Sequence, residues 1–83
     1  SLFLSFVYIL QCNDGTYYTG YAVDLEKRLQ QHQEGMACKY TRGRRPVSLV
    51  YHEKLVSKSE AMSREAAIKK LTRSEKETLI RST

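Results

Sequence analysis

The chain has 83 residues and a formal net charge of +5, and 41% of its residues are hydrophobic. This length suits one small domain and leaves no room for a second, so we expect a single domain over residues 1–83. The apolar opening at residues 1–4 is much too short to span a membrane. The basic excess and six tyrosines point first to a polyanionic partner such as nucleic acid.

Two segments near the start of the sequence, residues 6–10 and 17–21, are rich in β-branched and aromatic side chains. An Asn-Asp-Gly cluster at residues 13–15 separates them, and two such runs around this kind of turn predict a β-hairpin. The cluster suits a three-residue loop, in which a type I turn is closed by Gly15 in the left-handed conformation. We therefore expect two antiparallel strands joined by three residues.

The length of this loop decides which side chains share a face of the hairpin. A three-residue loop places Tyr8 opposite Gly20 and brings Tyr18 diagonal to Tyr8 on the same face. A two-residue turn would shift the register by one residue and send the two tyrosines to opposite faces. Tyrosine is a strong strand former, so the pair taken alone is better explained by ordinary packing than by a functional site.

The segment after the hairpin predicts a helix over residues 25–34. Asp24 is a favourable N-cap and Gly35 a favourable C-terminal stop, and two leucines four residues apart form the apolar stripe between them. Arg28 and His32 are also four residues apart, so they share a neighbouring face of this helix. A solvated polar flank is the alternative explanation of that pair.

Residues 39–46 are strongly basic, and their Gly and Pro predict a loop. Cations interleaved with an aromatic side chain suit phosphate contacts combined with base stacking. A merely solvated basic loop is an equal alternative. The candidate nucleic-acid-binding residues of this loop are Lys39, Tyr40, Arg42, Arg44 and Arg45.

Residues 47–56 alternate in hydrophobicity and predict a third strand, with Val47, Leu49 and Tyr51 on one face and Val50 on the other. Two helices are expected after it, because Ser-x-x-Glu capping boxes open at Ser57 and again at Ser74. The element order is then β-β-α-β-α-α. This order predicts an α/β (α+β) fold, with a three-stranded, mostly antiparallel sheet packed with helices.

Glu65 lies at the edge of the packing face of the first of these two helices. A carboxylate in that position is costly unless it has a cation, a metal ion or hydrogen-bond partners. A structural ion pair with Arg64 or Lys69 is one solution, and a functional metal site is another.

The two cysteines, Cys12 and Cys38, are far apart in the sequence, and neither has a partner at the spacing of a metal or redox motif. Since no signal-peptide pattern is present either, they indicate free thiols in a reducing compartment. We therefore expect a cytoplasmic location.

Two tripeptides of the hairpin resemble a known signature. Residues 7–9 (Val-Tyr-Ile) and 18–20 (Tyr-Thr-Gly) resemble the two motifs after which the GIY-YIG nuclease family is named. Val7 stands where the family has Gly, and Thr19 stands where it has Ile. Both changes fall at strand positions and keep the tyrosines, so the resemblance implies that the chemistry is retained.

Three later residues also fall where this family would have them. Arg28 and His32 resemble the helix that follows the second motif, and Glu65 resembles the single metal-binding glutamate on a later helix. The likeness extends over residues 6–81. It is nearest to the small single-domain bacterial branch of the YhbQ type, which has the same β-β-α-β-α-α order.

The resemblance implies a divalent-metal-dependent endonuclease that hydrolyses phosphodiester bonds in nucleic acid, with DNA as the expected partner and repair or processing as the role. Glu65 would hold one Mg²⁺ or Mn²⁺ ion, and Tyr8 would be the general base. Gly20 would let the backbone and a phosphate approach closely. The implied catalytic residues are Tyr8, Tyr18, Arg28, His32 and Glu65.

A different class of function fits the same fold. The chain is small and a lone domain has little grip on a substrate, so a non-catalytic nucleic-acid-binding module is the main alternative. It predicts salt-sensitive binding that needs no metal. A small adaptor for a protein partner is a third possibility, supported only by an ordinary surface. For an enzyme of this size, a protein partner would supply the missing substrate grip.

Overall fold

The structure, a computed structural model, describes residues 4–37 and 39–82. Its elements follow in the order β1 (Ser5–Gln11), β2 (Tyr17–Ala22), α1 (Leu25–Gln33), α2 (Lys39–Arg42), β3 (Ser48–Leu55), α3 (Lys58–Lys69) and α4 (Arg73–Arg81). The expected α+β fold is confirmed, with α2 as one added helical turn. No helix in the described ranges is long and apolar enough to cross a membrane. Cys38 and residues 1–3 lie outside the described residues.

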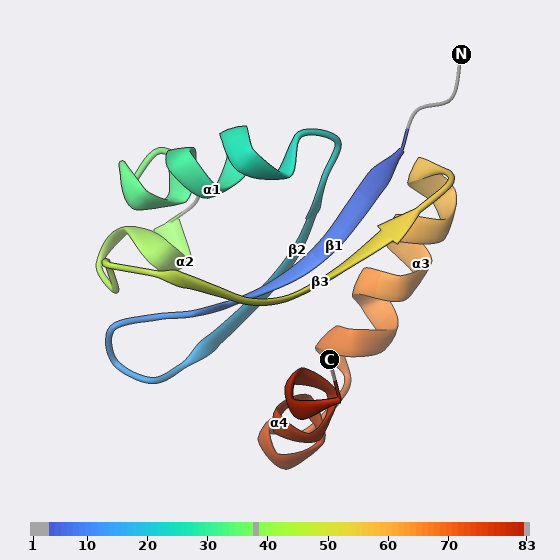
Figure 1. The fold of residues 1–83 in the computed structure, drawn as a ribbon. Coiled ribbons are helices and arrows are strands. Elements are labelled where there is room, and N and C mark those ends of the chain that lie inside the picture. Colours follow the sequence, from blue (N-terminus) through green and yellow to red (C-terminus); the bar gives the residue numbers. More distant parts are fainter. Residues whose placement is uncertain (1–3, 38, 83) are drawn as a thin grey trace.

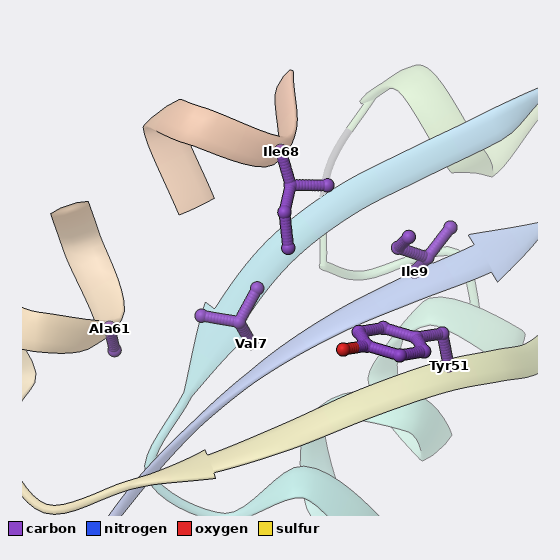
Figure 2. Close-up of a cluster of buried hydrophobic side chains, with 5 residues drawn as sticks. All are labelled: Val7, Ile9, Tyr51, Ala61 and Ile68. Carbon is purple, nitrogen blue, oxygen red and sulfur yellow. The ribbon is translucent and has the colours of Figure 1, made fainter. Parts of the chain in front are cut away.

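The three strands form one antiparallel sheet in the order β2-β1-β3, so β2 and β3 are its edges. Helices α1 and α2 lie on one side of this sheet and α3 and α4 on the other (Figure 1). Successive side chains of β1 point to opposite faces, as in any strand. Val7 and Ile9 therefore pack with Tyr51, Ala61 and Ile68 on the α3 face (Figure 2).

Tyr8 and Leu10, the alternate residues of β1, build a second core on the α1 face. Cys12 is buried in this core. Leu25 and Leu29, the apolar stripe of α1, pack against the same cluster. The sheet is thus buried on both faces, and the odd and even residues of its central strand belong to different cores.

The hairpin has the predicted three-residue loop. The Gly15 amide donates to the Cys12 carbonyl at 2.9 Å, and the Cys12 amide donates to the Thr16 carbonyl at 2.8 Å. Gly15 has a φ of +86°, a conformation in which an L side chain is disfavoured. The resulting register pairs Tyr8 with Gly20, so the tyrosines of the two motifs lie on the same face, as expected. This face is the one against α1.

The expected alternation of the third strand is wrong at one point. A β-bulge places Tyr51 opposite Ile9 but Leu49 opposite Leu10, so that Val50 is an extra residue in β3. An extra residue reverses the faces on either side of it. Tyr51 consequently packs in the α3-side core, whereas Leu49 packs in the α1-side core.

The helix starts agree with the sequence except at α4. The Asp24 side chain accepts from the Lys27 amide at the start of α1, and the Ser57 side chain accepts from the Glu60 amide at the start of α3. Helix α4 instead begins two residues earlier than expected. Its reciprocal capping box is formed by Thr72 and Glu75, a Thr-x-x-Glu pattern of the same chemistry as Ser-x-x-Glu.

The basic segment is not the plain loop that its Gly and Pro residues predict. Residues 39–42 form α2, because the Thr41 side chain is fully buried against α1 and holds this turn in place. The following residues are tied to the hairpin loop. Arg44 forms an ion pair with Asp14 at 3.0 Å, and its carbonyl accepts from the Asn13 amide at 2.8 Å.

Candidate active site

A polar cleft of about 380 Å³ lies at the β2 edge of the sheet. Because β2 has no neighbouring strand on its outer side, side chains from α1 on one face and from α3 on the other can meet around it. The cleft is lined by Tyr8, Tyr18, Gly20, Tyr21, Ala22, Val23, Arg28, Lys58 and Glu65. Four of the five predicted catalytic residues therefore line one cavity.

The fifth predicted residue, His32, lies directly behind Tyr8. Its Nε2 is 2.9 Å from the Tyr8 hydroxyl oxygen, and its Nδ1 is 2.9 Å from the hydroxyl oxygen of Thr41. The Tyr18 ring completes this group, with its centroid 5.2 Å from that of His32 and 6.4 Å from that of Tyr8. The two motif tyrosines and the histidine thus form one packed aromatic cluster.

Burial determines what His32 can do. Its side chain is 1% exposed, and the loss of solvent, together with the nearby positive charge of Arg28, lowers its pKa from 6.5 to about 4. The imidazole is therefore neutral near pH 7. A neutral, enclosed ring cannot contact a phosphate. The structure therefore supports a role for His32 through its contact with Tyr8 and not through direct binding of the substrate.

Glu65 reaches the cleft from α3, with its side chain 19% exposed. Lys69, one turn later, forms the ion pair that the sequence offered as a structural solution, at a distance of 3.7 Å. Arg64, the other candidate, pairs with Glu53 instead, at 2.9 Å. Since the Lys69 side chain is 53% exposed, this pair is weak and leaves the Glu65 carboxylate available.

The side chains available as metal ligands limit which metal ion the cleft could hold. No group of three or more His, Cys, Asp or Glu side chains could hold a metal within residues 4–37 and 39–82. A closed protein cage of the zinc type therefore does not fit. Glu65 in an open polar cleft does fit Mg²⁺, which usually binds through one or two carboxylates while keeping waters and substrate oxygens.

Lys58 is a lining residue that the sequence analysis missed. It is the first residue of α3 and precedes Glu65 by seven positions. Seven residues are close to two helical turns, so the two side chains lie on the same face of the helix. The seven-residue spacing from Glu65 is the sequence signal from which Lys58 could have been predicted. Lys58 and Arg28 bring positive charge to the cleft from its two sides.

Most of the predicted nucleic-acid-binding residues lie outside the cleft lining. Arg42 donates to the Gly35 carbonyl at 3.1 Å, and Arg45 donates to the Arg42 carbonyl at 2.9 Å. The guanidinium carbon of Arg44 lies 4.2 Å from the centroid of the Tyr40 ring. One face of Tyr40 is thus covered by this cation, so the ring is a poorer platform for base stacking than the sequence suggested.

Comparison with known proteins decides the family. Residues 4–78 match the GIY-YIG catalytic domain. The chain belongs to the GIY-YIG family. It is 55% identical to a UPF0213 protein of Halobacterium salinarum, over 88% of this chain and 95% of that protein. It is 54% identical to a UPF0213 protein of Clostridium perfringens, over 95% of this chain and 85% of that protein.

Solved structures agree with this GIY-YIG assignment. The solution NMR structure of a UPF0213 protein from Bacillus halodurans has a TM-score of 0.64 at 45% identity, covering 96% of this chain and 85% of that one. A solution NMR structure of a protein from E. faecalis has a TM-score of 0.65 at 44% identity, covering 95% and 84%. These relatives confirm the likeness to the small YhbQ-type branch of the family.

The GIY-YIG family is one of nucleases, and its fold is of the nuclease type. In this member the first motif is Val-Tyr-Ile and the second is Tyr-Thr-Gly. Val7 is fully buried in the α3-side core, so its replacement of Gly fills space on the face away from His32. Thr19 is also buried there, at 3% exposure, and its hydroxyl has no hydrogen-bond partner among the described residues.

Proposed function

We propose that this chain is a divalent-metal-dependent endonuclease that hydrolyses phosphodiester bonds in nucleic acid, with DNA as the expected substrate and repair or processing in the cytoplasm as the setting. The observation that carries the proposal is the cleft itself. It joins Tyr8 and Tyr18 of the hairpin, Arg28 of α1 and Glu65 of α3 in one cavity. These side chains come from four elements, and packing alone does not require them to converge around an open space.

Arg28 and Lys58 are suited to stabilise the negative charge of the phosphate during the reaction. Phosphodiester hydrolysis builds negative charge on the phosphoryl oxygens, and preorganised cations near that charge lower the barrier. Arg28 presents a planar fork of donors that matches two phosphate oxygens, whereas Lys58 supplies a mobile point charge. We assign Arg28 to the scissile phosphate and Lys58 to the same or a neighbouring phosphate of the backbone.

Tyr8 and Tyr18 would orient the attacking water. The Tyr8 hydroxyl is bound to neutral His32 at 2.9 Å, so it has a fixed position at the cleft wall. We assign Tyr8 as the general base toward that water and Tyr18 to a phosphate oxygen or to the water itself. His32 would act through Tyr8 and not on the substrate.

Glu65 would hold Mg²⁺ or Mn²⁺, with waters and substrate phosphate as the other ligands. The bound ion would supply Lewis-acid stabilisation of a phosphoryl oxygen and of the leaving group. The carboxylate is well suited to this role because it is partly enclosed and yet lines the cleft. Its exposed Lys69 partner can turn away when the ion binds.

One observation favours a second candidate, a nucleic-acid-binding module without catalysis. The Tyr8 side chain is only 1% exposed, which leaves little of it accessible to a water or a phosphate. In such a module Arg28 and Lys58 would still bind the backbone, and Tyr8 and His32 would only support the wall of the cleft.

The test is cleavage of labelled single-stranded, duplex and branched DNA and of RNA, in Mg²⁺ or Mn²⁺ and in EDTA. Glu65→Gln and Tyr8→Phe should each abolish cutting, because one removes the metal ligand and the other removes the hydroxyl. Glu60→Gln is the matched control, since Glu60 is an exposed carboxylate on the same helix. It should cut like the unchanged protein.

The outcomes separate the candidates. Metal-dependent cutting that is lost in both variants supports the nuclease with its assigned residues. Cutting that is lost only in Glu65→Gln supports Glu65 as the metal ligand and excludes Tyr8 as the general base. Cutting that survives both variants comes from a contaminant. No cutting of any substrate, combined with salt-sensitive binding, selects the binding module.

A further inference from the structure

Three side chains form a hydrogen-bonded chain that runs from the cleft wall into the interior. The Tyr8 hydroxyl contacts Nε2 of His32, and Nδ1 of His32 contacts the Thr41 hydroxyl, each at 2.9 Å. Tyr8 and His32 are 1% exposed and Thr41 is fully buried. Solvent therefore cannot replace either hydrogen bond.

We propose that Thr41 is a positioning residue of the candidate active site, whose hydroxyl accepts from Nδ1–H of His32 and thereby makes Nε2 the acceptor for the Tyr8 hydroxyl. The proposal deepens the proposed function and rests on it for the role of Tyr8. Nothing in the sequence motifs singles out Thr41, because its partner His32 lies nine residues earlier on a different helix.

A neutral imidazole forms hydrogen bonds through one N–H donor and one nitrogen lone pair. Two arrangements satisfy the observed distances: Thr41 accepts and Tyr8 donates, or Thr41 donates and Tyr8 accepts. The two arrangements differ only in which ring nitrogen of His32 carries the proton, so a buried partner on Nδ1 decides the tautomer.

The two arrangements give Tyr8 different properties. A phenol that takes a proton from water has to pass its own proton to another group. When Tyr8 donates to Nε2, that ring nitrogen can take the Tyr8 proton as the Tyr8 oxygen takes one from water. When Tyr8 accepts from Nε2–H, Nε2 already carries a proton and cannot take another. The first arrangement therefore fits the assigned role.

Through α2, Thr41 connects the candidate active site with the basic segment at residues 39–46. Thr41 belongs to α2, whose neighbouring residue Tyr40 lies with its ring centroid 5.6 Å from that of Tyr18. The short helix thus reaches both motif tyrosines, one through His32 and the other by ring contact. The same helix carries Lys39 and Arg42, so one helical turn of the basic segment contacts Tyr18 directly and Tyr8 through His32.

The test is the tautomer of His32, read from the ¹⁵N chemical shifts of its ring in the intact protein. We expect the Nδ1–H form in the unchanged protein and in Thr41→Ser, which keeps a hydroxyl. In Thr41→Val an Nδ1–H would lack a partner, whereas an Nε2–H would still have the Tyr8 oxygen. We therefore expect Thr41→Val to shift the ring to the Nε2–H form.

Two further variants keep the test decisive. Thr41→Ala removes the same acceptor without a branched methyl group, and it replaces Thr41→Val as the reporter where the valine variant does not fold. Thr19→Val is the matched control, a buried threonine on the other face of the sheet whose hydroxyl has no partner in the described structure. It should leave the His32 shifts unchanged.

Cleavage provides the second readout. Loss of the Thr41 hydroxyl should lower kcat about tenfold at unchanged KM, since Thr41 touches no substrate, and Thr41→Ser should restore most of it. The proposal is overturned if the unchanged protein holds the Nε2–H form or if Thr41→Val and Thr41→Ala leave the tautomer as it was. An inactive protein would refute the proposed function, while the ¹⁵N shifts would still decide the role of Thr41.

Discussion

Gly20 faces Tyr8 across the β1–β2 ladder so closely that a Cβ atom built on Gly20 would lie 2.6 Å from the Tyr8 hydroxyl oxygen. The end of a flexible side chain could move aside, but this hydroxyl is buried and bound to His32. The glycine of the second motif is therefore required by the tyrosine of the first. This reason differs from the close approach of a phosphate that the sequence suggested.

Gly20→Ala should consequently displace the Tyr8 ring and break its bond to His32. Overpacking of this kind costs about 1–3 kcal/mol, and cleavage should fall together with stability. Urea unfolding measures the first effect and the DNA assay the second. Gly43→Ala is the control, because a Cβ atom there meets nothing within 4 Å. Equal stability of the two variants would contradict the steric account.

The stability of the fold should depend on pH through His32. The pKa of His32 is about 4 in the folded protein, compared with an ordinary value of 6.5. Below pH 6.5 the unfolded chain therefore binds a proton at His32 that the folded protein does not bind. The stabilisation by neutral His32 is fully present above pH 6.5 and is lost as the pH falls toward 4. The loss should reach about 3 kcal/mol over that range.

Chemical unfolding at a series of pH values checks this expectation. His32→Gln should flatten the slope of the free energy of unfolding between pH 6.5 and 4. His52→Gln is the matched control, because His52 is exposed on β3. In this variant the free energy of unfolding should depend on pH as in the unchanged protein. A slope that persists in His32→Gln would assign the effect to other groups.

The two buried threonines should respond in opposite directions to substitution by valine. Thr19→Val removes a buried hydroxyl that has no partner among the described residues, so it should stabilise the fold by about 1 kcal/mol. Thr41→Val removes the partner of the His32 Nδ1 and should destabilise it by about 1–3 kcal/mol. Thermal or urea unfolding of the two variants side by side is the measurement.

Lys58 should contribute one phosphate contact. Lys58→Met should lower the affinity for DNA at low salt and reduce the slope of log affinity against log salt by about one. Lys54→Met is the control, since Lys54 is exposed on β3, at the edge of the sheet opposite the cleft. The slope of the unchanged protein should itself be small, because the cleft has few cations. Equal slopes for the two variants would exclude Lys58 from the interface.

Local sequence was sufficient for much of this fold. The three-residue loop, the register of Tyr8 and Gly20, and the caps at Asp24 and Ser57 each depend on residues close together in the chain. The bulge at Val50 was not predictable, because the alternation of side chains in one strand does not reveal an unpaired residue in a ladder with another strand.

The sequence by itself determined the hairpin, the approximate positions of α1, α3 and α4, and four of the residues that line the cleft, namely Tyr8, Tyr18, Arg28 and Glu65. Only the tertiary structure decided how they work together. It placed His32 behind Tyr8 and out of contact with solvent, gave it Thr41 as a second partner, and brought Lys58 and Glu65 of α3 to the same cleft as Arg28 of α1. Those relationships join residues from different elements, and they arise because both faces of the sheet are packed and its β2 edge is left open.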